Sequence, residues 1–300
     1  MSAPIHVHWN GRLVPADEAM VSVFDAGFLY GDGIYETLRI YRGCPFGFDR
    51  HWRRLEHGAR GVGLSLPARD DVRRGLDELL RADDLPSAVA RITITRGRLA
   101  RRLDLSSAGR PSVLVTAEAI DPGADDARAR GVRVVHSSYV RPSDHSLAGV
   151  KSTNYQVSLL ARNEAREQGA AEVLVPNQHG HVVEAAAANV FVVEGGVLVT
   201  PPLRSGILGG ITREVVLEVA GDAGLPLRQE TLAPERVEAA DEVFLTGTTI
   251  EVTPVVTIGD RPVAAGRPGP ITLDLRRRYR ERVDAETRPS GSEAPSDSTR

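Results

Sequence analysis

Strict alternation of apolar and polar residues marks several short segments of the chain as β-strands. The segments 5–9 and 12–14 flank Asn10-Gly11, a dipeptide that favours the tight turn of a β-hairpin. The segment 35–41 alternates in the same way and returns through 46–48 as a second hairpin. Further strands are expected at 90–95, 113–117, 132–135, 173–175, 182–183, 190–193, 197–199, 243–246 and 252–258.

A different spacing, with apolar residues three or four positions apart, predicts four helices over 50–60, 70–81, 156–167 and 211–220. In the first of them, Trp52, Leu55 and Ala59 share one face. Asp49 precedes this segment and is expected to be its N-cap, because a short acidic side chain can accept the free N–H groups of a first turn.

The order of these elements predicts an α+β protein with two mixed domains, because the strands come in runs and do not alternate strictly with helices. The segment 121–131 is charged and poor in large apolar residues, so it is expected to link the domains, although part of it can form a short helix. The expected division is a smaller domain over 1–120, the linker over 121–131 and a larger domain over 132–280. The polar segment 281–300 is expected to be disordered.

The composition narrows the class of protein. The chain has 300 residues, 41% of them hydrophobic, and a net charge of −3 with acidic and basic residues interspersed, which argues against nucleic acid or a membrane as partner. A single cysteine, Cys44, excludes an internal disulfide or a cysteine-based zinc site, and no metal is expected. No signal peptide is recognised at the start and no apolar run reaches the ~18 residues of a membrane helix, so a cytoplasmic protein is expected.

Lys151 is the only lysine of the chain, and every other cationic side chain of the Lys/Arg type is an arginine. One interpretation is compositional, since the chain is rich in arginine throughout. The other is chemical, because an amine can lose its proton and condense with an aldehyde, whereas a guanidinium stays protonated.

Five further motifs each have a structural and a functional interpretation. The glycine-rich sequence 206–213 precedes a helix, and it either binds a phosphate or forms a tight turn. Glu184 either pairs with a ligand or is an exposed loop residue. The hydroxyl-rich sequence 246–254 binds an anion or forms a turn, Arg54 binds an anion or is solvated, and the tyrosines of 28–36 line a pocket or pack in a core. Together, a lysine, a carboxylate and a phosphate site are what pyridoxal 5′-phosphate requires.

Six motifs follow one another along the chain: Tyr-Gly-Asp-Gly-x-Tyr-Glu, His-x-x-Arg-Leu, Lys-Ser-Thr-Asn-Tyr, Glu-x-x-x-x-Asn-Val-Phe, Gly-Ile-Leu-x-Gly-Ile-Thr-Arg and Gly-Thr-x-x-Glu-Val-Thr-Pro. In this order they resemble the class IV aminotransferases, the fold-type IV group of pyridoxal-phosphate enzymes. That group includes branched-chain aminotransferases, D-amino acid aminotransferases, (R)-amine transaminases and aminodeoxychorismate lyase. The resemblance extends from about Trp9 to Tyr279 and implies the two-domain, D-amino acid aminotransferase-like fold and a homodimer.

The resemblance also implies roles for individual residues. Lys151 matches the lysine that forms the Schiff base and moves the proton, Glu184 the partner of the pyridine nitrogen, and Arg54 the phosphate arginine. The other implied contacts are Tyr155 with the ring hydroxyl; Ile211, Thr212 and Thr248 with the phosphate; Tyr30 and Tyr35 with the pocket wall; and Thr248 and Thr249 with the substrate carboxylate.

The resemblance implies an amino acid or amine donor and a 2-oxo acid acceptor as substrates, and the motifs leave their exact type open. Arg101 matches the arginine that traps the carboxylate in D-amino acid aminotransferases, but Leu103 stands where those enzymes have a histidine. Where branched-chain enzymes have Gly-Ile-Arg, this chain has Thr37-Leu38-Arg39. The arginines of 96–102 bind a dicarboxylate such as 2-oxoglutarate or are solvated. Two alternatives are a lyase of the aminodeoxychorismate type, which releases pyruvate, and a non-catalytic module that binds a phosphate ligand.

Overall fold

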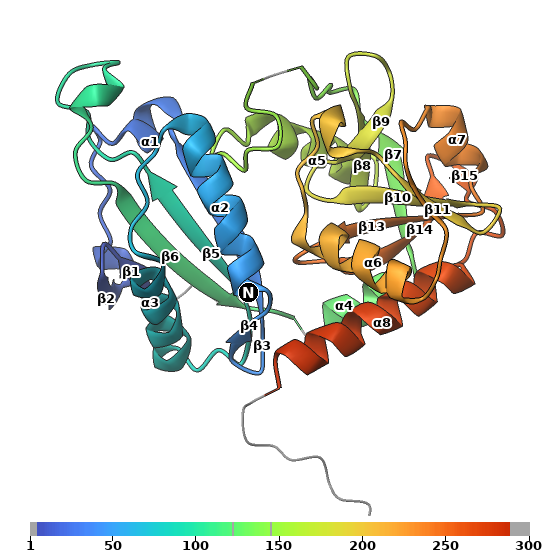
Figure 1. Ribbon diagram of the computed structural model, residues 1–300, viewed down its shortest axis with the longest axis horizontal. Coiled ribbons are helices and arrows are strands. Elements are labelled where there is room, and N and C mark those ends of the chain that lie inside the picture. Colours follow the sequence, from blue (N-terminus) through green and yellow to red (C-terminus); the bar gives the residue numbers. More distant parts are fainter. Residues whose placement is uncertain (1–4, 122, 145, 289–300) are drawn as a thin grey trace, which may run out of the picture.

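The computed structural model describes residues 5–121, 123–144 and 146–288, which form two β-sheets with their own helices. The two sheets lie side by side along the long axis of the molecule (Figure 1). The first sheet uses strands from the part of the chain before residue 120, and the second uses strands from the part after residue 131.

The first sheet is antiparallel throughout and has the strand order β2-β1-β6-β5-β3-β4. The expected hairpin at Asn10-Gly11 is confirmed, because β1 pairs with β2 and Trp9 lies opposite Arg12. The bounds of its strands are β1 His6–Trp9, β2 Arg12–Pro15, β3 Gly33–Tyr41, β4 Cys44–Pro45, β5 Ser87–Thr95 and β6 Ser112–Ala119.

One face of the first sheet packs against helices α2 (Phe48–Val62) and α3 (Arg69–Ala82). Ile34, Leu38 and Ile40 of β3 belong to this core, together with residues of both helices. Because side chains alternate between the two faces of a strand, Tyr35, Thr37, Arg39 and Tyr41 lie on the opposite face. This second face contacts the other half of the protein, because the hydroxyl of Tyr41 donates a hydrogen bond to Glu251.

The second sheet is mixed and has the order β12-β11-β10-β13-β14-β7-β8-β9, with β15 beside β14. It closes on itself, because β9 also pairs with β10, Asn189 lying opposite Glu184. The bounds of its strands are β7 Val132–His136, β8 Glu172–Pro176, β9 Val182–Ala185, β10 Asn189–Glu194, β11 Val197–Thr200, β12 Leu227–Gln229, β13 Glu242–Gly247, β14 Glu251–Ile258 and β15 Arg261–Pro262.

Helices α6 and α8 cover part of this second sheet, and their apolar residues form a common core with β10, β11 and β13. Phe46 of the first half enters that core and packs edge-on against Tyr279 of α8, with 5.8 Å between ring centroids. The helices not yet given are α1 Ala26–Tyr30, α4 Gly123–Ala129, α5 Gln156–Glu167, α6 Ile211–Asp222, α7 Pro234–Ala239 and α8 Pro270–Glu286, with 3-10 turns at Ala16–Glu18, Leu105–Ser107 and Leu203–Ser205.

Three expectations about local structure are wrong. Gly47, not Asp49, precedes helix α2, so Asp49 lies inside the first turn. Phe48 begins that helix and does not continue the returning strand, which ends at Pro45. The segment 281–286 is helical and not disordered, because Tyr279 and Val283 are four residues apart and bury one face of α8. The rest of the expected tail beyond residue 288 lies outside the described residues.

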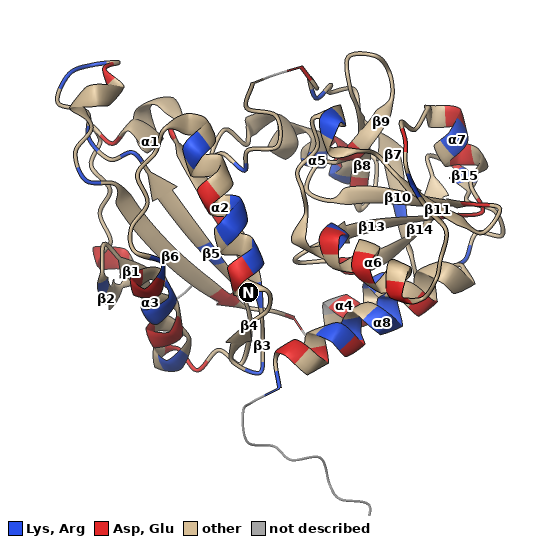
Figure 2. Cartoon of the chain, viewed as in Figure 1, with Lys and Arg blue, Asp and Glu red and all other residues tan. Residues whose placement is uncertain are grey.

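Acidic and basic side chains are mixed along α2, α3, α6 and α8 (Figure 2). On α8, for example, Arg277 forms ion pairs with both Asp274 and Glu281. Among the described residues, no helix is long and apolar enough to cross a membrane.

Candidate active site

A cavity of about 660 Å³ lies between β3 of the first sheet and the loops of the second. Its size is within the range of roughly 300–1,000 Å³ that is common for small-molecule sites. Nine residues expected at a cofactor or substrate site line it: Tyr35, Arg54, Lys151, Tyr155, Glu184, Ile211, Thr212, Thr248 and Thr249.

The backbone around Lys151 is bound to β3. The N–H of Tyr35 donates to the carbonyl of Lys151 at 2.9 Å, and the N–H of Thr153 donates to that of Gly33, also at 2.9 Å. The side chain of Lys151 is directed at the ring of Tyr35, with Nζ 4.4 Å from the ring centroid. Burial and the positive charge of Arg54 lower the pKa of Lys151 to about 8, so about a tenth of the amine is unprotonated at pH 7.

The carboxylate of Glu184 is buried on β9. Its Oε2 accepts from the N–H of Leu208 at 3.2 Å. Its Oε1 lies 2.7 Å from Nε of Arg141 as an ion pair, but the described residues offer this oxygen no partner in hydrogen-bond geometry. Burial raises the pKa of Glu184 against the opposing effect of Arg141. A buried carboxylate oxygen without a donor at a cavity wall suits a ligand with an N–H group.

Also at the cavity wall, helix α6 begins at Ile211 with Gly210 as its N-cap residue. No side chain caps this end, so the N–H groups of its first turn and the helix dipole are available to an anion. Arg213, which belonged to the expected anion site, instead donates to the carbonyl of Pro201 and to Gln229. Its pKa is lowered by burial.

Arg54 reaches this anion end from α2. Its Nε and Nη2 donate to the two oxygens of Glu36 at 2.8 and 2.6 Å, and its Nη1 donates to the carbonyl of Gly209 at 2.8 Å. A guanidinium has five N–H donors, so two remain after these bonds. Burial alone would raise the pKa of Glu36, but Arg54 and His51 outweigh that effect and lower it to about 2. The charged pair therefore fixes the direction of the arginine.

The aromatic wall consists of Tyr35 and Tyr155, whose rings meet edge-on with 5.8 Å between centroids. Burial raises the pKa of both hydroxyls, so both are protonated near neutral pH. The hydroxyl of Tyr155 donates to the carbonyl of Ala186 at 3.2 Å. Thr248 and Thr249, which also line the cavity, lie in the turn between β13 and β14.

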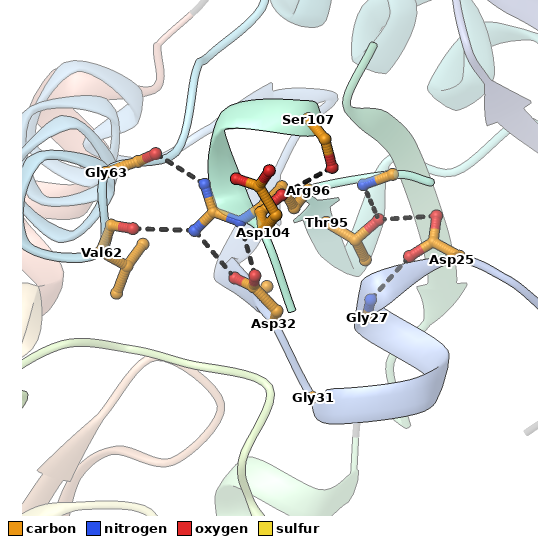
Figure 3. A network of polar contacts seen from close by, with 12 residues as sticks. Asp25, Gly27, Gly31, Asp32, Val62, Gly63, Thr95, Arg96, Asp104 and Ser107 are labelled. Carbon is orange, nitrogen blue, oxygen red and sulfur yellow. Dashed lines mark hydrogen bonds and ion pairs between the residues drawn. The ribbon is translucent and has the colours of Figure 1, made fainter. Parts of the chain in front are cut away.

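Tyr30 and Arg101 do not line the cavity of this chain. Tyr30 ends the short helix α1 and is 39% exposed, and the Arg101 side chain is 82% exposed, 3.7 Å from Asp104. The two segments that carry them are joined by Arg96, which donates to both oxygens of Asp32 and to the carbonyls of Val62 and Gly63 (Figure 3). Arg96 is thus a structural residue, neither solvated nor directed at a substrate.

The sequence did not single out several residues that line the cavity. Arg91 of β5 lies opposite Thr37 of β3, and its guanidinium is 3.6 Å from the centroid of the Tyr35 ring. Arg141 is paired with Glu184. Thr246, by contrast, begins the expected anion motif 246–254, and its hydroxyl is buried without a hydrogen-bond partner in the described structure. Strand alternation from Tyr35 could have indicated Thr37, but the position of Arg91 depends on the pairing of β3 with β5.

The family model for class IV aminotransferases matches residues 33–258. The chain belongs to this family. It is 36% identical over 279 residues, 92% of its length and 95% of the relative's, to a protein of Methanocaldococcus jannaschii with a provisional name as a branched-chain-amino-acid aminotransferase. It is 33% identical to D-alanine aminotransferase of Listeria innocua, over 91% of this chain and 94% of that one. The branched-chain aminotransferase of Thermoproteus uzoniensis, solved with norvaline, superposes with a TM-score of 0.86 at 33% identity, covering 95% and 96% of the two chains.

The class IV aminotransferases depend on pyridoxal phosphate, and another branched-chain enzyme that superposes on this chain, with a TM-score of 0.88, was solved with pyridoxamine 5′-phosphate. The donor set of the cavity fits such a cofactor. A single amine, a buried carboxylate with one oxygen that accepts no hydrogen bond within the described residues, and an uncapped helix N-terminus match its aldehyde, ring nitrogen and phosphate in chemical type. The family and fold expected from the six motifs are confirmed, as is an enzyme of the transaminase type. The lyase alternative is not favoured, because the relatives named above are aminotransferases.

Proposed function

We propose that this aminotransferase uses Lys151 as its covalent and proton-transferring residue, and that it moves an amino group from an amino acid to a 2-oxo acid. The observation that carries the proposal is that the only lysine of the chain lies in one cavity with Glu184 and the N-terminus of α6. Bound pyridoxal phosphate would supply an aldehyde for the bond to Lys151 and a ring that accepts electrons.

Each polar residue of the cavity has a separate task in this proposal. Lys151, with its lowered pKa, would accept the proton from the substrate Cα and pass it to the carbon of the cofactor that carried the aldehyde. Glu184 would keep the ring nitrogen protonated through Oε1, which accepts no hydrogen bond within the described residues and lies 2.7 Å from Nε of Arg141. The phosphate is held by the two remaining donors of Arg54, by the N–H groups of Ile211 and Thr212 and by Thr248, and Tyr155 faces the ring hydroxyl.

The substrate is proposed to bind between the Thr248–Thr249 turn and Tyr35. A backbone turn with two hydroxyls suits the carboxylate that every amino acid and 2-oxo acid carries. Arg91 lines the same cavity and donates within the chain through Nε to Thr93, so its outer nitrogens can receive a second carboxylate. This arrangement favours a dicarboxylate acceptor such as 2-oxoglutarate. The donor is proposed to be a branched-chain L-amino acid or a D-amino acid, the two types named for the relatives.

A homodimer is proposed as the active unit. Tyr30 and Arg101 lie outside the cavity of their own chain, on joined segments with exposed apolar side chains that include Met20, Phe28 and Leu103. Covering this surface with a second copy would bury it and would bring the two residues to a neighbouring cavity. We further propose that each sheet with its helices is one domain, divided at 121–131, and that the protein is cytoplasmic.

Borohydride reduction of the cofactor-saturated protein, followed by peptide mapping, tests the central proposal. A phosphopyridoxyl group is expected on Lys151, and no such group is expected in Lys151→Arg. In a second measurement, an amino donor is added to the unreduced protein, and its visible absorbance is expected to change. An unmodified Lys151 in saturated protein, or a visible band that no amino donor alters, would contradict the proposal.

A further inference from the structure

Glu251 is the first residue of β14 and combines two unfavourable properties. It is 2% exposed, and its φ is +52°, in the left-handed region that side chains other than glycine rarely adopt. A buried acidic residue in such a conformation persists only where its surroundings hold it in place.

The contacts of its carboxylate come from both halves of the protein. Oε1 accepts from the hydroxyl of Tyr41 on β3 at 2.8 Å, and Oε2 accepts from Nε of Arg280 on α8 at 2.9 Å. The Tyr41 ring is itself fixed edge-on against Phe46, and the guanidinium of Arg39 lies 5.1 Å from its centroid. Glu251 therefore connects the first sheet to α8.

Glu251 also closes the turn that carries the two threonines of the cavity. It pairs with Gly247 at the base of this turn, and the N–H of Ile250 donates to the carbonyl of Gly247 at 3.2 Å. Tyr41 lies on the same face of β3 as Tyr35 and Thr37, and both of those residues line the cavity. The Tyr41–Glu251 bond thus joins two segments that contribute to the cavity: β3, which carries Tyr35 and Thr37, and the turn that carries Thr248 and Thr249.

A second connection strengthens this one. Arg39 donates to Asp125 of α4 at 2.8 Å, and Arg276 of α8 donates to the carbonyls of Asp125 and Val252 at 3.0 and 2.6 Å. Val252 follows Glu251 directly, so the start of β14 is held through both its side chain and its backbone. The alternative is that these bonds serve the fold alone, because removing one partner of a buried ion pair leaves an uncompensated charge and destabilises a protein.

We propose that Glu251 is a positioning residue for substrate: through Tyr41 and Arg280 it holds the Thr248–Thr249 turn at a fixed separation from β3, and so sets the affinity for the carboxylate of the amino and 2-oxo acids. Glu251 touches neither substrate nor cofactor. The inference rests on the proposed binding of the substrate carboxylate at this turn.

The test uses the cofactor-loaded enzyme with Glu251→Gln, Tyr41→Phe and the double variant. Each single variant removes or weakens the same bond, so KM for both substrates should rise about 10-fold while kcat changes little, as a charged hydrogen bond that acts on binding would cause. The double variant should show little further increase, because the two residues act through one bond. Glu251→Gly removes the carboxylate but accepts the positive φ, and it should raise KM as much as Glu251→Gln.

The matched control is Asp284→Asn. Its partner Arg42 follows Tyr41, so this exposed ion pair also joins the first half of the protein to α8, but it does not involve the turn. KM should be unchanged in this variant. Amide hydrogen exchange gives a readout that does not depend on turnover: the amides of 247–250 should exchange faster in Glu251→Gln than in Asp284→Asn.

Unchanged KM values in Glu251→Gln and Tyr41→Phe, with normal exchange at the turn, would overturn the proposal. So would a fall in kcat alone, or a loss of thermal stability in Glu251→Gln without any change in KM. If Glu251→Gln does not fold, Tyr41→Phe still tests the proposal, because it keeps the aromatic ring and removes only the hydroxyl. Borohydride trapping on Lys151 separates this result from a failure of the proposed function, because the cofactor bond should form in all these variants.

Discussion

The side chains of Glu184 and Asn189 bind the two backbone polar groups of one residue, Leu208. Oε2 of Glu184 accepts from the N–H of Leu208 at 3.2 Å, and Nδ2 of Asn189 donates to the carbonyl of Leu208 at 2.8 Å. The two residues lie opposite each other where β9 pairs with β10. Because Leu208 is followed by Gly209 and by Gly210, the N-cap residue of α6, this segment connects the carboxylate of Glu184 to the N-terminus of α6.

Asn189→Ala is expected to weaken cofactor binding about 10-fold. The carbonyl of Leu208 would lose its donor, and an unpaired group at a buried site costs on the order of 1–3 kcal/mol. The Oδ1 atom of Asn189 also fills the space where a Cβ at Gly210 would lie, so its loss frees the start of α6 to shift. Titration of apoprotein with pyridoxal phosphate measures the effect, and Asn163→Ala on the exposed face of α5 is the control. Equal affinity in both variants would show that Asn189 has no part in the site.

The reaction of the apoprotein with pyridoxal phosphate should depend on pH through Lys151. Only the unprotonated amine attacks an aldehyde, and the pKa of Lys151 is lowered from 10.5 to about 8 by burial and by Arg54. The rate of covalent binding should therefore rise with pH up to about 8 and level off above it. Stopped-flow absorbance between pH 6 and 10 measures this profile. A rate that still rises steeply above pH 9 would mean that the amine keeps its ordinary pKa.

Glu36 should stabilise the fold above pH 5 and lose this contribution in acid. Its pKa is lowered from 4.5 to about 2, so it binds its proton more readily in the unfolded chain than in the folded one. Its contribution is complete above pH 4.5 and is lost as the pH falls through 2; the shift corresponds to about 3 kcal/mol.

Urea unfolding of wild type and Glu36→Gln at several pH values measures this contribution. The difference in the free energy of unfolding between the two proteins should stay constant from about pH 7 to pH 5 and then fall by about 1.4 kcal/mol per pH unit between the two pKa values. A difference that does not change between about pH 5 and pH 3 would mean that the pKa of Glu36 is not lowered by folding.

Local patterns were sufficient for much of the fold and for part of the site. Strand alternation located β3 and β5, and Asn10-Gly11 located the first hairpin, because both signals depend on neighbours in the chain. Lys151 was found because an amine is chemically distinct among arginines. The link between Glu36 and Arg54 was not foreseen, since it depends on how α2 packs across β3.

The helical segment 281–286 was missed for a related reason. Its composition is that of a disordered tail, yet Val283 is buried against the second sheet and Arg282 forms ion pairs with Glu218 and Asp222 of α6. Tertiary contacts of this kind override local composition. The role of Arg96 could not be predicted from local sequence for the same reason. Its hydrogen-bond partners are far away in the sequence, and they show that this candidate ligand residue is structural.

Arg101 provides a test of whether the active unit shares residues between subunits. Arg101→Ala and Lys151→Arg should each be inactive alone if the arginine serves the cavity of a neighbouring copy. Mixed dimers would then combine an intact Lys151 from one chain with an intact Arg101 from the other.

Unfolding the two variants together and refolding them should restore about a quarter of wild-type activity, because half of the randomly formed dimers are mixed and each has one complete site. The control is refolding of each variant by itself, which should restore nothing. Native mass spectrometry of differently tagged chains measures the mixed dimer directly. If mixed dimers form and remain inactive, Arg101 does not act across subunits, and its exposed side chain on this chain is then simply solvated.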